Sequence, residues 1–159
     1  MEAKKKFYSK EEAYRKALDY CAFQERCHQE VRDKLYYWGL HHEDVEALIS
    51  QLISEGFLNE ERFAKAFAGG KFRIKNWGRN KIRNELNQRK ISDYCIKQAL
   101  AAIDEKDYLD TLHHVIEKKS REVNETNFFS RNNKLAMFAI SRGFESELVW
   151  EIIRKKFEK

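Results

Sequence analysis

Hydrophobic residues recur three and four positions apart along most of the chain, the spacing that gives a helix one apolar face. Over residues 10–25 this face consists of Ala13, Tyr14, Ala17, Leu18 and Cys21. Over a later helix it consists of Val45, Leu48, Ile49, Leu52 and Ile53. The pattern therefore predicts an all-α fold.

Residues typical of helix ends stand where these periodic segments begin and end. Ser9 and Glu12 form a capping-box pair, in which the Ser9 oxygen accepts the Glu12 N–H and the Glu12 carboxylate reaches back. Gly39 and Gly56 are expected to end two further helices, because glycine readily adopts the left-handed conformation. Asn59, followed by two glutamates, predicts the cap and acidic first turn of the next helix.

One pattern of apolar positions occurs three times. It first consists of Val31, Leu35, Gly39, Leu40, Val45, Leu48, Ile49 and Leu52. A step of 51 residues reaches Ile82, Leu86, Lys90, Ile91, Ile96, Ala99, Leu100 and Ile103. A further 53 residues lead to Leu135, Ala139, Gly143, Phe144, Val149, Ile152 and Ile153. Unrelated amphipathic helices can align by chance, but two matches at nearly equal spacing, each across a turn, favour a true repeat.

The repeat predicts three tandem three-helix units in an elongated, curved arrangement, because each unit alone buries little core. Each unit has one longer helix, over residues 10–25, 60–76 and 107–122. The expected division is a charged flexible tail over 1–8 and units over 9–57, 58–105 (basic) and 106–159.

The composition agrees with a helical protein and excludes several classes. The 159 residues include no proline and six glycines, which disfavours a collagen-like chain, a turn-rich sandwich or a Pro/Gly-rich disordered chain. The longest apolar run, Leu135 to Ile140, is far shorter than the roughly 20 residues that span a bilayer. That run is either core or partner-facing surface. No secretory signal is evident, so we expect a cytoplasmic protein without membrane contact.

No residue pattern indicates catalysis, a metal or a cofactor. Cys21, Cys27 and Cys95 form an odd set without CxxC spacing, which fits small buried thiols in a reducing compartment. Cys21, Cys27 and His28 could supply half of a metal site, but no second cluster has ligand spacing. No nucleophile–base pair can be assembled either, so the chain is not expected to be an enzyme.

The charge is concentrated in the second unit. The net charge is +5, yet the segment from Lys65 to Lys90 holds nine basic residues and one acid, Glu85, so the rest of the chain carries −3. A solvated helix surface is the alternative, but the lack of interspersed acids favours a surface that faces a polyanion. The candidate contact residues are Lys71, Arg73, Lys75, Arg79, Lys81, Arg83 and Lys90, with Trp77 as a candidate for stacking on bases.

Three stretches resemble the RecX family, bacterial regulators of the RecA recombinase. Glu30–Leu35, followed by Gly39, is similar to the family's E-L-R-x-K-L-x-x-x-G. Residues Gly56–Ala64 resemble its G-[YL]-[LI]-[DN]-[DE]-x-R-[FY]-A link. Residues Gly78–Leu86 resemble its G-x-x-[RK]-I-x-x-E-L segment. Lys90 stands where the family often has glycine, which leaves open whether that turn closes differently.

The resemblance implies three tandem three-helix repeats and a function without catalytic residues. Such proteins lie in the groove of the RecA–single-stranded-DNA filament. There they inhibit ATP hydrolysis, strand exchange and co-protease activity in DNA repair and the SOS response, or destabilise the filament. We expect the chain to be a monomer and its binding to naked DNA to be weak. A helical module that binds bare DNA or RNA is the alternative, and a scaffold that contacts only protein is a third.

Overall fold

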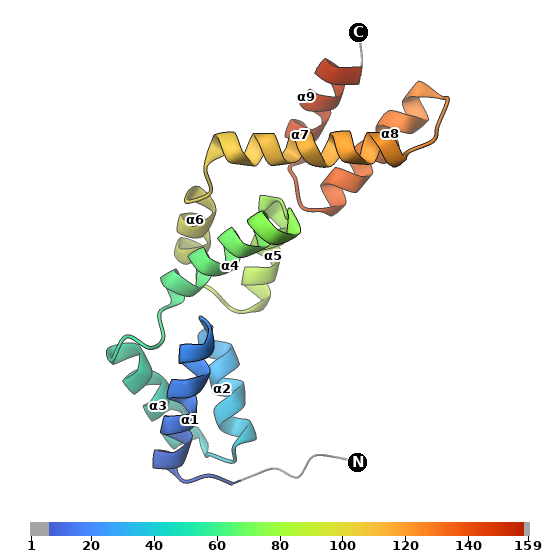
Figure 1. Cartoon of the computed structure of the whole chain (residues 1–159). Helices are drawn as coiled ribbons and strands as arrows, with labels where there is room; N and C mark the ends of the chain where they lie inside the picture. Colours follow the sequence, from blue (N-terminus) through green and yellow to red (C-terminus); the bar gives the residue numbers. More distant parts are fainter. Residues whose placement is uncertain (1–6, 158–159) are drawn as a thin grey trace, which may run out of the picture.

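The computed structural model describes residues 7–157, and within them the chain forms nine α-helices in three sets of three. The first set comprises α1 (Lys10–Phe23), α2 (His28–Tyr37) and α3 (His42–Ser54). The second comprises α4 (Glu60–Lys75), α5 (Arg79–Gln88) and α6 (Asp93–Ala101). The third comprises α7 (Glu105–Glu122), α8 (Phe128–Ser141) and α9 (Ser146–Phe157). The sets follow one another along a curved axis (Figure 1), as the repeat predicts.

The helix starts form largely as the sequence predicts. Asn59 Oδ1 accepts the Arg62 N–H at 2.8 Å at the start of α4. At α1 the Glu12 N–H donates to Ser9 Oγ at 3.2 Å. In a complete capping box the Glu12 carboxylate accepts the backbone N–H of Ser9. Here it instead accepts the Ser9 hydroxyl, at 3.0 Å.

The turn between the second and third helices of each unit closes in the same way. Gly39 and Gly143 adopt φ values of 91° and 99°, and Lys90 adopts 59° at the equivalent position. The lysine therefore does not change how the turn closes. It takes the left-handed conformation at a steric cost that glycine does not carry.

The repeated apolar positions form the core. In the first unit these positions are buried in a cluster of their own, whereas those of the second and third units belong to one continuous cluster. Within the apolar run of α8, Leu135 and Ala139 are buried and Met137 is half exposed, so the run contributes to both core and surface. Of the cysteines, Cys27 and Cys95 are buried and Cys21 is partly buried.

Most of the predicted tail, residues 1–6, lies outside the described part of the chain. Tyr8 belongs to the first unit, since its N–H donates to the Trp38 carbonyl at 3.0 Å and its ring meets the Trp38 ring edge-on. Over residues 7–157, no helix is long and apolar enough to cross a membrane. The same residues contain no group of three or more His, Cys, Asp or Glu side chains arranged to hold a metal ion.

Candidate nucleic-acid interface

Two of the predicted basic residues lie over the ring of Trp77, which follows the end of α4, and a third lies one turn along α4. The Lys71 and Lys81 ammonium groups lie 5.0 and 4.6 Å from the centre of the Trp77 ring, one from α4 and one from α5. Lys75 is one helical turn beyond Lys71 and therefore shares its side of α4. We call Lys71, Lys75, Trp77 and Lys81 the Trp77 face.

The aromatic side chains of this region hold the cations in place. Trp77 is partly buried, and its ring meets Phe67 edge-on at 6.4 Å. Phe67 in turn contacts Lys71 at 5.5 Å and Arg89 at 4.6 Å from its ring centre. Such contacts stabilise a cation by about 0.5–1 kcal/mol at exposed sites. The Trp77 face therefore presents positioned ammonium groups, which suits contact with phosphates.

Arg79 lies in a different environment from the Trp77 face. Its side chain is 18% exposed, and its guanidinium donates to Glu145 at 2.7 Å and to Glu105. The guanidinium also lies 3.8 Å from the centre of the Tyr108 ring. Burial, and then the hydrogen bond from Tyr108 to Glu145, raise the pKa of Tyr108 above its usual range. This network joins the second and third units, so the geometry favours a structural role for Arg79 over contact with a partner.

The other three predicted residues face elsewhere. Arg73 lines a hollow beside Gly69 that also contains Asp104 and Asp107, on a different side of α4 from Lys71. Arg83 donates to Asn80 Oδ1 at 2.8 Å and lies near α6. Lys90 is exposed at its turn. The seven predicted residues are thus spread over several sides of the second unit, and only the Trp77 face is compact.

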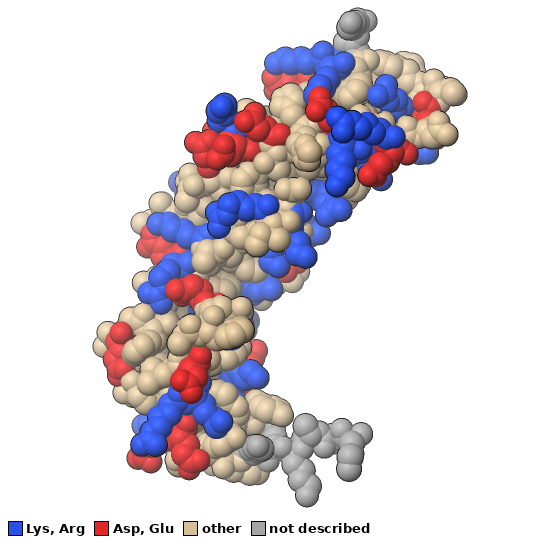
Figure 2. Space-filling view, in the orientation of Figure 1, with Lys and Arg blue, Asp and Glu red and all other residues tan. Residues whose placement is uncertain are grey.

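Basic residues of the third unit, outside the predicted set, continue the Trp77 face. Lys118, Lys119 and Arg142 line a cavity that also contains Lys75. Figure 2 shows Lys and Arg side chains following one another along one flank, from the third unit onto the second. The adjacent pair Lys118-Lys119 gave no clear signal in the sequence, because acidic residues such as Glu117 and Glu122 lie among the basic residues of α7.

Three family models match this chain, one for each unit. They are described as the first, second and third three-helix domains of RecX, and they match residues 13–52, 59–100 and 105–153.

Curated relatives agree with these matches. The chain is 30% identical over 145 residues to "Regulatory protein RecX" of Clostridium tetani, and the match covers 90% of this chain and 64% of that protein. Proteins of the same name from Clostridium perfringens and Bacillus cytotoxicus are 30% and 24% identical, over 80% and 87% of this chain. The chain spans only 60% and 52% of the length of these two relatives.

Solved structures share the fold. A crystal structure of RecX from Lactobacillus salivarius superposes with a TM-score of 0.83 at 23% identity, covering 92% of this chain and 95% of that one. A second crystal structure, of a regulatory protein RecX, gives 0.80 at 23% identity, with 92% of this chain and 72% of the other covered.

Proposed function

The chain belongs to the RecX family, and on that premise we propose that it is a regulator that binds the RecA filament on single-stranded DNA. Binding lowers the rate of ATP hydrolysis, strand exchange and co-protease activity, and so acts on recombinational repair and the SOS response. No residue of the chain acts as a catalyst in this account. Regulation comes from binding energy that favours one conformation of the filament over another.

The observation that carries the proposal is the Trp77 face on an elongated chain. A filament of protein on DNA is helical and carries the negative charge of the strand, and a curved row of three units can follow its groove over more than one RecA protomer (Figure 1). Lys71, Lys75 and Lys81 supply the positive charge, and Trp77 holds two of the ammonium groups in position. A single copy of the chain is sufficient for this mode of binding.

The decisive experiment measures ATP hydrolysis by RecA on single-stranded DNA while the protein is added up to stoichiometric amounts. We expect the rate to fall. An unchanged rate at equal concentrations of protein and RecA overturns the proposal.

A second measurement separates the filament from bare nucleic acid as the target. Fluorescence anisotropy compares binding to a labelled oligonucleotide with and without RecA, at several salt concentrations. Tighter binding to the RecA-coated strand supports the proposal. Equal or tighter binding to the bare strand instead supports a general nucleic-acid-binding module.

A further inference from the structure

A cavity of about 360 Å³ lies at the junction of the second and third units. Its walls come from the end of α4, the second half of α7 and the end of α8. The charged residues that line it are Lys75, Lys118, Lys119, Arg142 and Glu122. It therefore brings four cations and one carboxylate, from three helices, around one small volume.

Most of this positive charge has no counter-charge among residues 7–157. Glu122 pairs with Lys119 at 3.6 Å. Over residues 7–157, no carboxylate lies within 4.0 Å of the charged groups of Lys75, Lys118 or Arg142. Counting each Lys and Arg as +1 and Glu122 as −1, the formal charge of the lining is +3.

Stabilisation of helix ends accounts for only part of this charge. The carboxyl ends of α4, α7 and α8 lie at the cavity, and each helix end carries roughly −0.5 of an elementary charge. Together they offset about one and a half of the three positive charges, so about +1.5 remains. A surplus of this size around a partly enclosed volume is suited to an anionic ligand.

Two of the four cations are also held in position by an aromatic side chain. The Lys119 ammonium and the Arg142 guanidinium lie 4.6 and 5.1 Å from the centre of the Phe138 ring. The Arg142 carbonyl accepts the Gly78 N–H at 2.8 Å, which ties this wall of the cavity to the start of α5. An anion that enters meets two groups already ordered by the protein, which lowers the conformational entropy lost on binding.

We propose that this cavity binds a phosphate of a single-stranded DNA backbone and carries the strand from the Trp77 face onto the third unit. The proposal rests on the proposed function and adds a second, separate contact to it. A strand is favoured over a free nucleotide because Lys75 belongs to both the cavity and the Trp77 face. The flank in Figure 2 shows the same continuity of positive charge.

The test compares wild type with a K118A/R142A variant for binding to a labelled thirty-nucleotide oligo-dT, without RecA, from 20 to 300 mM salt. A phosphate that is no longer neutralised reduces the slope of log affinity against log salt by about 0.7. We expect a reduction of that size and a loss of affinity of roughly 3- to 10-fold at 100 mM salt. The matched control is K97A/K106A, which removes two exposed lysines elsewhere and should leave the slope unchanged.

Three outcomes overturn the proposal. The first is an unchanged slope in a K118A/R142A variant whose thermal unfolding matches that of wild type. The second is no measurable binding of wild type to oligo-dT at 20 mM salt. The third is that 1 mM ATP abolishes the difference between wild type and variant while inorganic phosphate at the same ionic strength does not, because the cavity is then a nucleotide site.

The salt dependence of oligo-dT binding is measured without RecA, so its outcome is independent of the RecA ATPase assay. If wild type fails to slow RecA while the slope still changes in K118A/R142A, the proposed function fails and the phosphate site stands. If wild type slows ATP hydrolysis by RecA and the slope is unchanged in K118A/R142A, the proposed function stands and the phosphate site fails.

Discussion

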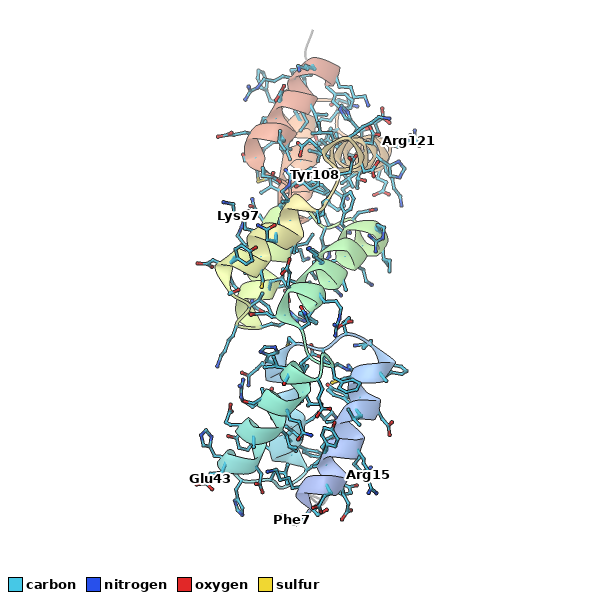
Figure 3. All side chains as sticks on the ribbon, turned by 90° about the vertical axis from the view of Figure 1, so that its left-hand side faces the viewer. Phe7, Arg15, Glu43, Lys97, Tyr108 and Arg121 are labelled. Atoms are coloured by element: carbon cyan, nitrogen blue, oxygen red, sulfur yellow. The ribbon has the colours of Figure 1, made fainter. Side chains whose placement is uncertain are left out.

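The second and third units are joined through their backbones, whereas the first and second units are joined through the linker and side chains. At the second junction the Gly78 N–H donates to the Arg142 carbonyl at 2.8 Å, and the Asn80 N–H donates to the Gly143 carbonyl at 2.9 Å. Tyr108 lies at this boundary (Figure 3) and packs between Phe72 and Phe144 in the shared core.

The first junction has a different character. Arg62 pairs with Glu25 at 2.5 Å, and an open groove of about 570 Å³ lined by Phe63 and Phe67 separates the two units there. Between residues 7–56 and 60–104, no backbone hydrogen bond crosses the junction. Cys27 is the exception to this loose packing, because its side chain is buried in the core cluster of the second unit.

The comparison shows that one repeated unit can be joined in two ways. In repeat proteins, stability is approximately the sum of unit stabilities and interfaces between neighbours. We therefore expect the second and third units to unfold together and the first to open at lower cost.

The largest effect should follow from Gly78→Ala. A Cβ at Gly78 would lie 2.4 Å from backbone atoms of Gly143 and Phe144, which cannot move without breaking the second junction. We expect a loss of about 3 kcal/mol in the free energy of unfolding, measured by urea denaturation.

The control for this change is Gly70→Ala within α4. A Cβ at Gly70 meets no atom within 4 Å, so the substitution should stabilise the helix by about 1 kcal/mol. If Gly78→Ala lowers the free energy of unfolding no more than Gly70→Ala does, the backbones at the second junction are not in close contact.

Two arginines allow the junctions to be compared directly. Arg79→Ala removes a largely buried side chain that binds Glu105 and Glu145, and should cost about 2 kcal/mol. Arg62→Ala removes a side chain that is 44% exposed, and should cost about 0.5 kcal/mol. Equal losses in urea denaturation would contradict the difference between the junctions.

Lys90→Gly should stabilise the protein by about 1 kcal/mol, since glycine adopts the φ of 59° without the steric cost that lysine carries. The gain should appear in the unfolding of the second and third units and leave that of the first unchanged. Hydrogen exchange followed by mass spectrometry resolves the three units. A loss of stability would mean that the lysine side chain contributes more than its backbone conformation costs.

The smallest effect concerns the thiol at the first junction. Burial raises the pKa of Cys27 to about 11, so less than about 1% is thiolate at pH 8 and alkylation in the native state should be slow. In urea below the main transition, we expect Cys27 to be alkylated before Cys95, because the first junction opens first. Simultaneous labelling of both thiols would indicate a single cooperative unit.

The fold was largely predictable from the sequence because the spacing of apolar residues directly encodes helix faces, and the repeat encodes their grouping. The site was less predictable. A basic run along the chain does not show which side chains turn inward, and Arg79 does so because Glu105 and Glu145, far away in sequence, converge on it. The contribution of Lys118 and Arg142 depends likewise on the packing of separate helices. The contact residues and the monomeric state stay predictions.

The central claim is that the Trp77 face binds the filament, and a charge-reversed K71E/K75E/K81E variant tests it most directly. Its control carries the same change of charge at exposed lysines away from the face, namely K16E/K97E/K106E. Anisotropy of labelled protein on a preformed RecA–single-stranded-DNA filament gives the affinity of each, and circular dichroism checks that helicity is unchanged. We expect the Trp77-face variant to lose at least about tenfold in affinity, equivalent to roughly 1.4 kcal/mol, and the control to lose less than about twofold. Equal losses in the two variants would contradict the claim.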